Sequence, residues 1–255
     1  MERLSFTSLK EFNKSPNHYL WYKSNKRETS GAMFKGSLVD CLILEPWEFD
    51  KRYVVFDETE ILNELKEAKS PRATKVYKLW KEQVDKDAEG KSLITVDELH
   101  EAELMKASVE QVYRFQNEGS VQVQVKLEGT INGVEFIGYA DEVDSTLGLV
   151  TDLKTTKDAS YDHYQRSIVN FSYYLQAAIY LELSGCKNFQ HVAVENKAPY
   201  NAAKYLFHPD VIAFGKKRLY ELTDEFKRWQ DSGKPNTGYK DQTMDLPHWY
   251  TKKFK

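Results

Sequence analysis

Apolar residues recur every three or four positions through the first 115 residues, the spacing of helices that pack one face on a core. The first helix has Thr7 and Ser8 as candidate N-caps, and Ser15-Pro16 is expected to end it and begin the next. A third helix is expected to stop before Pro46, because the residue preceding a proline disfavours helical geometry. The predicted helices cover about residues 5–14, a segment starting at Ser15-Pro16, residues 31–44, and two or three charged helices within 58–116.

The pattern changes to strand alternation after residue 116. Val121, Val123, Val125 and Leu127 alternate with polar residues, and the next two strands are joined by a tight turn around residues 145–147. The predicted elements are strands at about 121–127, 133–141 and 148–154, a long helix at 161–183, strands at 189–195 and 203–207, and a helix at 210–231. This order predicts an α/β fold with a mixed central β-sheet flanked by helices.

Length and composition fit one domain spanning residues 1–255. The chain is 41% hydrophobic and 29% charged, so it can bury a sizeable core, and no low-complexity linker or internal repeat divides it. We expect a mainly helical part (1–116), a sheet-and-helix core carrying the candidate chemistry (117–207), and a C-terminal helix and tail (208–255). The apolar runs are too short to span a bilayer, and the N-terminus lacks a secretory signal. A cytoplasmic protein with no membrane partner is expected.

The net charge of −3 is unevenly distributed along the chain. Residues 1–35 carry seven Lys and Arg against three acids, and residues 216–255 carry ten against six. Each end is therefore about +4 and the middle about −11. An acidic centre with basic flanks suits an enzyme that gathers divalent cations and binds a polyanion, although such charges also simply solvate a surface.

The hairpin Gly138–Lys154 is the strongest candidate for chemistry. If its turn is centred on the Thr146–Leu147 bond, Asp141 lies directly across from Asp152. Strand alternation then puts Asp152 and Lys154 on one face. Like charges placed opposite each other destabilise a sheet unless something offsets them. Two carboxylates and one ammonium would share one patch, where a bound divalent cation would offset the repulsion.

The oxygen atoms of this hairpin suit a hard cation. Mg²⁺ commonly binds one or two carboxylates together with waters and phosphate oxygens. Asp141 and Asp152 fit that role, with the Leu153 carbonyl as a further ligand, while Lys154 would orient an attacking water and offset charge on a phosphate. The alternative is a salt bridge among these charges on a solvated strand edge. Leu149–Leu153 reads as a buried strand, where unpaired acids are costly, and this favours the metal site.

Several segments resemble one known family. Gly138–Asp141 followed by Asp152-Leu-Lys154-Thr-Thr resembles the active-site signature of the PD-(D/E)XK nuclease superfamily. In particular it is similar to the RecE-like branch, the exonuclease VIII-type phage recombination nucleases. The other similar segments are Ser15-Pro16 with Tyr19, Gly36–Pro46 with its Leu-Glu-Pro end, and the Gln-x-x-x-Tyr run from Gln176 to Tyr180. The resemblance spans about residues 5–182.

The resemblance implies a restriction-endonuclease-like core that hydrolyses DNA with Mg²⁺ or Mn²⁺. It implies digestion of linear double-stranded DNA from an end in the 5′-to-3′ direction, a single-strand annealing partner protein and a homo-oligomeric ring. It also implies that Gln176 and Tyr180, which share a helix face with Tyr173, approach the DNA backbone. From the residues alone, the alternative is that both tyrosines pack under the sheet and that Gln176 caps a backbone group.

Two positions depart from the family pattern. Asp40 stands where the family usually has His, so it is either a third metal ligand or the mark of an altered site. Gln122 and Gln124 occupy the stretch in which related nucleases often carry a metal-contacting Glu. Two cysteines exclude the four-cysteine iron–sulfur cluster of some relatives, and the six scattered histidines suggest no Zn²⁺ site.

An aromatic and basic cluster near the N-terminus is a candidate for stacking bases and contacting phosphates, although helix aromatics are more often core. It comprises Tyr19, Trp21 and Tyr22 with Lys10, Lys14, Lys23, Lys26, Arg27 and Lys35.

Three other interpretations of the sequence remain open. The same hairpin would serve an endonuclease that cuts within duplexes or at junctions. A catalytically inactive DNA-binding or partner-binding protein could keep a nuclease fold, which Asp40 supports and the intact set of Asp141, Asp152 and Lys154 opposes. An unrelated α/β protein could carry the motif by accident.

Overall fold

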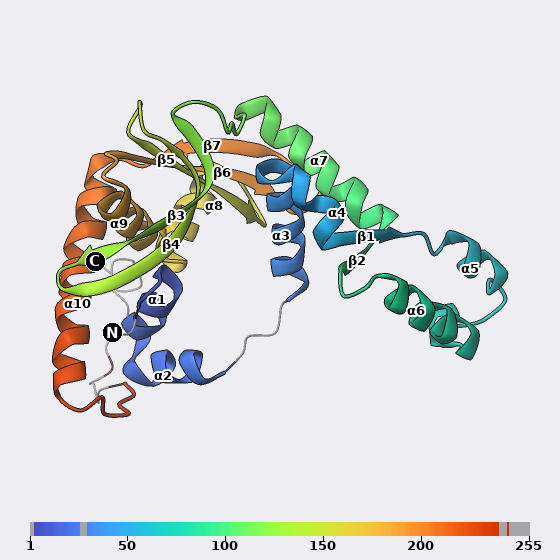
Figure 1. Cartoon of the computed structure of the whole chain (residues 1–255), viewed down its shortest axis with the longest axis horizontal. Helices are drawn as coiled ribbons and strands as arrows, with labels where there is room; N and C mark the ends of the chain where they lie inside the picture. The colour runs from blue at the N-terminus through green and yellow to red at the C-terminus, as the bar shows by residue number, and fades with distance from the viewer. Residues whose placement is uncertain (1–2, 26–29, 240–243, 245–255) are drawn as a thin grey trace, which may run out of the picture.

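The computed structural model describes residues 3–25, 30–239 and 244 (Figure 1). Its α-helices are α1 (Phe6–Lys14), α2 (Pro16–Ser24), α3 (Gly31–Leu44), α4 (Phe49–Arg52), α5 (Thr59–Glu64), α6 (Lys75–Asp87), α7 (Val96–Val112), α8 (Tyr161–Asn170), α9 (Tyr173–Ser184) and α10 (Pro209–Asp231). Its 3-10 helices are η1 (Pro46–Glu48) and η2 (Pro71–Ala73). Its strands are β1 (Tyr53–Phe56), β2 (Ser92–Thr95), β3 (Val121–Ile131), β4 (Val134–Asp144), β5 (Leu149–Thr156), β6 (Asn188–Glu195) and β7 (Ala202–Leu206).

The central sheet contains five strands in chain order, β3-β4-β5-β6-β7. Neighbouring strands are antiparallel except β5 and β6, which are parallel. A parallel pair needs a crossover connection, and α8 and α9 provide it. The predicted α/β fold, with a three-stranded meander inside a mixed sheet flanked by helices, is confirmed.

The β4–β5 hairpin has the predicted register. Glu142 pairs with Thr151 and Asp144 with Leu149, so the turn is centred on the Thr146–Leu147 bond. The Asp144 carboxylate closes the turn, because its Oδ1 accepts hydrogen bonds of 2.9 Å from the backbone N–H groups of Thr146 and Leu147. This local bonding explains why the register could be read from the sequence.

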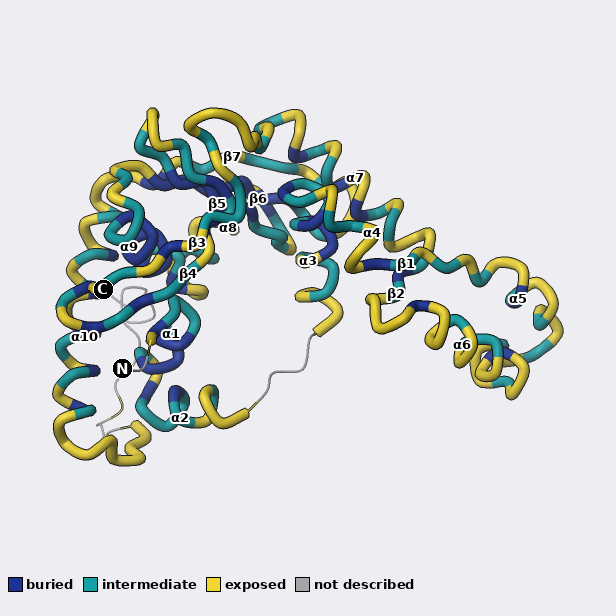
Figure 2. Tube along the Cα trace, in the orientation of Figure 1, coloured by how far each residue is buried: buried dark blue, intermediate teal, exposed yellow. Residues whose placement is uncertain are grey.

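Helix α9 covers one face of the sheet, with α1 and α10 packed around it (Figures 1 and 2). The core on this face includes Phe136, Val150 and Phe189 from the sheet and Leu175 from α9. Helix α10 approaches α9 so closely that a Cβ at Gly215 would lie 2.1 Å from the Tyr174 carbonyl oxygen. A side chain at Gly215 is therefore excluded.

Helices α3 and α7 pack against the opposite face of the sheet. Their core contacts include Val39, Met105, Leu153 and Val192. Beside them, β1 and β2 form a small parallel sheet with Tyr53 opposite Ser92. Neither strand is among the elements predicted from the sequence, because each has only four residues and lies among charged helices.

Two further expectations needed correction. The long helix expected at residues 161–183 is two helices, α8 and α9, separated at Ser172, whose φ of 58° is left-handed and breaks the helical path. The N-cap of α1 is Ser5 rather than Thr7 or Ser8. Its hydroxyl accepts from the Ser8 N–H while the Ser8 hydroxyl accepts from the Ser5 N–H, which makes a capping box.

Helices α5 and α6 with η2 project from the body of the protein as an arm, defined here as residues 57–91 (Figure 1). Most of its surface is exposed or half-buried (Figure 2). Glu58 ties the arm together, because it accepts a 2.6 Å hydrogen bond from the Tyr77 hydroxyl and forms an ion pair with Arg72. No helix in the described part of the chain is long and apolar enough to cross a membrane.

Candidate active site

Asp141 lies where the hydrogen-bonded ladders on both sides of β4 are interrupted. The β4–β5 ladder ends at Glu142 and Thr151, and the β3–β4 ladder skips Asp141 and the residue opposite, Gln124. Gln124 has a φ of 51°, a conformation that non-glycine residues adopt rarely and that clusters at functional sites. The alternation of β4 also breaks here, since Ala140 and Val143 both pack against the core under α9.

The Asp141 carboxylate takes over bonds that the ladder would have made. Its Oδ2 accepts a 2.7 Å hydrogen bond from the Leu153 backbone N–H, and its Oδ1 accepts one of 3.3 Å from the Gln124 side-chain amide. The N–H and C=O of one strand residue face the same neighbouring strand. The Leu153 carbonyl therefore points into the same gap between β4 and β5 as the Asp141 carboxylate.

Asp152 is 2% exposed and is held from two directions. Its Oδ1 accepts a 2.7 Å hydrogen bond from the Gln176 side-chain amide on α9, and its Oδ2 forms an ion pair with Lys154. The Lys154 ammonium also lies 5.4 Å from the centre of the Tyr173 ring. The hairpin thus gathers the two carboxylates and the ammonium that the sequence analysis grouped together.

Burial and like charge raise the pKa values of two site acids, Asp141 and Asp40. Burial, and then the negative charges of Asp152 and Asp40, raise the pKa of Asp141 well above its ordinary value. Burial likewise raises the pKa of Asp40 to about 7, against the lowering effect of Lys154. Burial alone would lower the pKa of Lys154, but Asp152 and Asp141 together raise it above its ordinary value. A positive charge between the acids is therefore strongly favoured.

Helix α9 supports the hairpin from below through Gln176 and Tyr180. Both are buried, with exposures of 4% and 7%, and the Gln176 amide binds Asp152 rather than pointing to solvent. Tyr180 packs under β4 so tightly that a Cβ at Gly138 would lie 2.8 Å from its ring. The packing of Tyr180 under the sheet follows the alternative noted in the sequence analysis.

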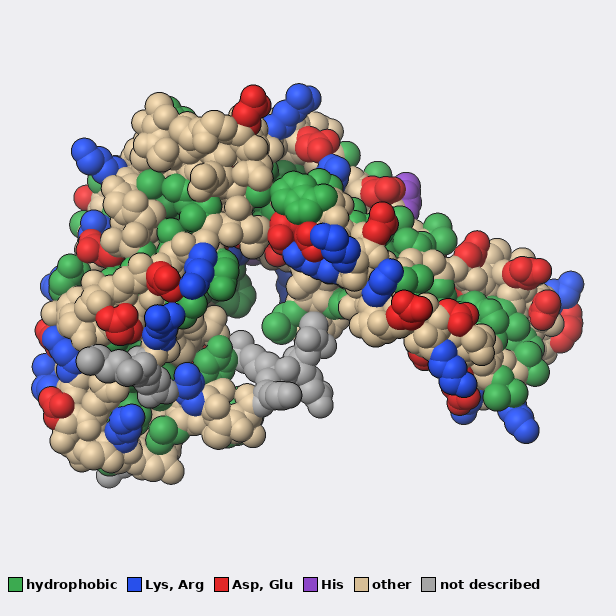
Figure 3. All heavy atoms as spheres, viewed as in Figure 1, with side chains coloured by type: hydrophobic (Ala, Val, Ile, Leu, Met, Phe, Trp, Pro, Cys, Tyr) green, Lys and Arg blue, Asp and Glu red, His purple; other side chains and the backbone are tan. Residues whose placement is uncertain are grey.

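Helix α3 brings Asp40 to the site from the other side. Its close approach to β5 occurs at Gly36, where a Cβ would lie 3.3 Å from the Thr155 hydroxyl. Asp40 is half-buried, and its charge acts on Asp141. The space-filling view is hollowed between the β3–β4 hairpin, which carries Asp141, and α3, which carries Asp40 (Figure 3).

Two residues near Asp152 escaped the sequence analysis. His191 on β6 pairs with Asp152 in the parallel ladder, is fully buried, and has its Nε2 3.7 Å from Asp152 Oδ2. The Tyr164 hydroxyl on α8 lies 2.7 Å from His191 Nδ1. Burial, and then Lys154, lower the pKa of His191 well below its ordinary value, so the ring is neutral. A lone histidine in the apolar run Phe189–Val194 was the available signal.

The N-terminal aromatic and basic cluster is not a single surface. Tyr19 is 1% exposed and packs edge-on against Phe12, Phe226 and Trp229, so it belongs to the core and cannot stack on bases. Trp21 is 60% exposed. The cluster members Lys26 and Arg27 lie outside the described residues.

Comparison with known proteins identifies the family. Residues 5–240 match a family model described as a PDDEXK-like domain of unknown function. The chain belongs to this PDDEXK-like family. Membership of the PD-(D/E)XK superfamily, expected from the hairpin, is thereby confirmed. No curated protein matches the chain.

Two solved structures are similar to the PDDEXK-like chain. A protein of Eubacterium rectale, named as a candidate exonuclease, is 17% identical with a TM-score of 0.62, and the match covers 92% of this chain and 83% of that one. This likeness supports the fold. A phage-related exonuclease from Haemophilus somnus 129PT is 12% identical with a TM-score of 0.38, covering 91% and 96% of the two chains, which is too low to carry an argument.

The donors in the PDDEXK-like site suit a hard divalent cation. Among the described residues, no three His, Cys, Asp or Glu side chains converge as a ready-made metal cluster. Asp141, Asp152 and the Leu153 carbonyl nevertheless offer oxygen atoms around one gap, and the raised pKa of Asp141 shows that its negative charge favours a cation there. These few protein oxygen atoms would suit a cation that keeps several of its water ligands, as Mg²⁺ usually does.

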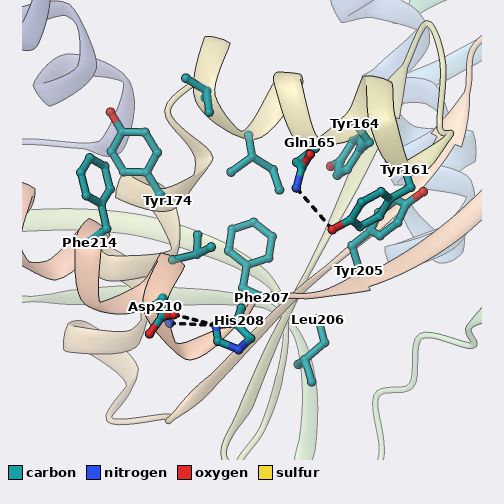
Figure 4. A pocket seen from close by; sticks show the side chains of 13 residues that line it. Tyr161, Tyr164, Gln165, Tyr174, Tyr205, Leu206, Phe207, His208, Asp210 and Phe214 are labelled. Atoms are coloured by element: carbon teal, nitrogen blue, oxygen red, sulfur yellow. Dashed lines mark hydrogen bonds and ion pairs between the residues drawn. The ribbon is translucent and has the colours of Figure 1, made fainter.

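A separate cavity of about 510 Å³ lies between α8, β7 and the start of α10 (Figure 4). Its lining is mainly apolar and includes Tyr161, Tyr164, Phe207 and Phe214. None of the site acids lines it. Tyr164 is the link between the two regions, because its ring lines the cavity while its hydroxyl contacts His191.

Proposed function

We propose that this PDDEXK-like protein is a metal-dependent deoxyribonuclease that digests linear double-stranded DNA. The observation that carries the proposal is the convergence of Asp141, Asp152 and Lys154 beside the Leu153 carbonyl, in a gap where the β4–β5 ladder has ended. Their order matches the active-site signature that the sequence resembles. Residues 1–255 would act as one nuclease domain.

Asp141 and Asp152 would hold Mg²⁺ or Mn²⁺ with the Leu153 carbonyl, and Asp40 would add an oxygen directly or through water. The bound ion would polarise the scissile phosphate. It would also lower the pKa of a water molecule, so that this water loses a proton more readily and can attack the phosphate. The charges on the three aspartates, which repel one another in the free protein, would favour its binding.

Lys154 would act on the phosphate and the attacking water. Its ammonium has three N–H donors, and Asp152 uses only part of this hydrogen-bonding capacity. The ammonium stays charged because its pKa is raised. A fixed positive charge stabilises the charge that develops on phosphate oxygens. Gln176 would hold the Asp152 carboxylate in one orientation, and Tyr180 would hold β4 under Asp141 through its contact with Gly138.

We further propose that digestion starts at a DNA end and runs 5′ to 3′, preparing single strands for an annealing partner, and that the active form is a homo-oligomeric ring. The RecE-like sequence motifs support this, and the Eubacterium rectale protein with the same fold is named as a candidate exonuclease. The net positive charge of both ends of the chain suits contact with DNA.

The test uses linear and covalently closed circular duplexes, with Mg²⁺, Mn²⁺ or EDTA, and the variants Lys154→Ala and Lys157→Ala. Lys157 is the matched control, because it follows the same strand but is exposed. Metal-dependent loss of linear DNA only, abolished by Lys154→Ala and kept by Lys157→Ala, is expected. Strands labelled at the 5′ or the 3′ end give the polarity.

The other outcomes are equally decisive. Cutting of the closed circle would establish an endonuclease of the same fold instead. DNA binding without cleavage in either metal would leave an inactive binding protein. Thermal unfolding with added Mn²⁺ gives a separate readout of the metal site, since a ligand that binds the folded state raises its stability.

A further inference from the structure

His191 is a buried side chain with one satisfied and one unsatisfied ring nitrogen. Its Nδ1 contacts the Tyr164 hydroxyl, while its Nε2 has no hydrogen-bond partner among the described residues and faces Asp152 Oδ2 at 3.7 Å. Buried polar atoms in native proteins are nearly always bonded. The ring of His191 is held in place edge-on by Tyr173, Phe189 and Phe207. The ring of His191 is fixed, and its unbonded nitrogen faces a site acid. This arrangement points to a function for His191 at the site.

The hydroxyl of Tyr164 decides which nitrogen carries the proton. A neutral imidazole has one N–H donor and one bare acceptor nitrogen. If the Tyr164 hydroxyl donates to Nδ1, the proton of His191 sits on Nε2 and points toward the Asp152 carboxylate. The opposite tautomer would aim a lone pair at that carboxylate, which is repulsive. The arrangement of Tyr164, His191 and Asp152 therefore favours the Nε2–H form.

We propose that Tyr164 and His191 are positioning residues for Asp152, with the His191 Nε2–H donating to Asp152 Oδ2 once a bound cation displaces the Lys154 ammonium from that oxygen or the substrate phosphate draws it away. In the free protein Lys154 pairs with this oxygen, and Gln176 holds the other one. Once the ammonium leaves, His191 is the adjacent buried donor. The carboxylate would then keep its orientation while its remaining lone pairs face the metal. This inference rests on the proposed function.

Partners behind the metal ligands are known to matter, because they orient the ligand and tune its basicity. Their loss typically weakens metal binding or activity about 10–100-fold. His191→Leu removes the donor and keeps an apolar side chain, so Mn²⁺ affinity is expected to fall by about that factor. His191→Gln puts an amide N–H close to the position of Nε2, and it is expected to restore most of the affinity. A merely structural histidine would show no such difference between the two variants.

Tyr164→Phe tests the other half of the pair. It keeps the ring that stacks on Tyr205 at 4.9 Å but removes the hydroxyl that fixes the tautomer of His191. Tyr205→Phe is the matched control, because its hydroxyl donates to the Ala159 carbonyl and not to His191. Mn²⁺ affinity is expected to fall in Tyr164→Phe and to stay at the wild-type value in Tyr205→Phe.

Two measurements on the full chain decide the proposal. Long-range ¹H–¹⁵N spectra of the metal-free protein report the tautomer of His191, and calorimetric titration with Mn²⁺ alone reports affinity in all five proteins. Circular dichroism melting of each variant confirms that it is folded. An Nε2–H signal in the wild type, lost or mixed in Tyr164→Phe, is expected together with weaker Mn²⁺ binding by His191→Leu.

Failures of the two proposals look different. An Nδ1–H signal, or equal Mn²⁺ affinity in wild type, His191→Leu and Tyr164→Phe, would overturn the positioning role and leave the nuclease proposal intact. Absence of Mn²⁺ binding in the wild type would count against the metal-dependent function. The tautomer would then still decide whether His191 donates to Asp152.

Discussion

Two neighbouring rungs of the β4–β5 hairpin carry buried acids and use them differently. Glu142, opposite Thr151, is 1% exposed and accepts hydrogen bonds from the Tyr113 hydroxyl and, at 2.8 Å, from the Gln116 backbone N–H. One rung further, Asp141 lies opposite Asp152, and the Asp152 carboxylate forms an ion pair with Lys154. Both rungs have neutral donors, but only the second adds a charged partner, Lys154, and a second carboxylate.

The difference separates an acid whose hydrogen bonds are satisfied within the fold from the acids that we propose bind a metal ion. Neutral donors satisfy Glu142 inside the protein, so the rung is complete without a ligand. At the rung of Asp141 and Asp152, burial and then the like charge of Asp152 raise the pKa of Asp141, so a positive charge is favoured there. Interrupted ladders and the strained backbone at Gln124 occur at this second rung only among the three strands of the meander.

The largest effect is expected from the isosteric substitution Asp152→Asn. Loss of one carboxylate of the proposed metal site is expected to lower the cleavage rate at least about 10³-fold, or about 4 kcal/mol of transition-state stabilisation. The free energy of unfolding is expected to change little, because the repulsion with Asp141 disappears as the attraction to Lys154 is lost. Cleavage rates and urea unfolding measure the two effects separately.

Glu142→Gln is the matched control one rung away. Its amide group must face one of the two donors, so about 1–3 kcal/mol of stability is expected to be lost. The cleavage rate per folded molecule should stay within a few-fold of wild type. Equal rate losses in Glu142→Gln and Asp152→Asn would refute the division between the two rungs.

A smaller effect is expected when a neutral donor is removed from each acid. Gln176→Met takes away the amide that holds Asp152, and about a 10–100-fold loss of rate is expected. Tyr113→Phe takes away the hydroxyl that binds Glu142, so its cost should appear in stability rather than in rate. If both variants lost only stability, Gln176 would be a structural residue like Tyr113.

Substitutions that disturb the packing beneath the site are expected to have smaller effects than substitutions of its charged residues. Gly138→Ala would push a methyl group to 2.8 Å from the Tyr180 ring, and such overpacking costs about 1–3 kcal/mol. Gly129→Ala on β3 is the control, because its Cβ would meet only the end of the flexible Leu183 side chain, at 3.3 Å. Thermal melting is expected to place Gly138→Ala well below Gly129→Ala, and equal melting temperatures would contradict the tight contact with Tyr180.

The geometry of the hairpin could be predicted because its determinants are local. Alternation with period two and the turn closed by Asp144 set the register, and the register brings Asp141 next to Asp152. The Gln-x-x-x-Tyr spacing placed Gln176 and Tyr180 on one helix face. What it did not reveal is that this face points inward, where Gln176 binds Asp152 and Tyr180 packs under Gly138.

The missed features depend on contacts between distant segments. His191 meets Asp152 only because β6 joins β5 in parallel at a register that no local pattern encodes. The β1–β2 pair likewise joins two short strands across the whole arm. Ser172 breaks a helical pattern at a left-handed residue, and tertiary packing overrides the local preference there.

The smallest expected effect concerns a third kind of acid, on the arm. Whereas burial raises the pKa of Glu142 and Asp141, the hydrogen bond from Arg72 lowers the pKa of Glu58 below its ordinary value of 4.5. A lowered folded-state pKa means that Glu58 contributes stability above about pH 4.5, and that this contribution is lost as the pH falls further.

Urea unfolding at pH 7 and pH 3.5 tests this contribution. The difference in the free energy of unfolding between the two pH values is expected to be smaller in Glu58→Gln than in wild type. Arg72→Gln should match it, because it removes the same pair, whereas Lys66→Gln, a charge loss elsewhere on the arm, should keep the wild-type difference. If Glu58→Gln kept the full pH difference, the ion pair with Arg72 would contribute no pH-dependent stability, and the contrast between Glu58 and the acids of the hairpin would not hold.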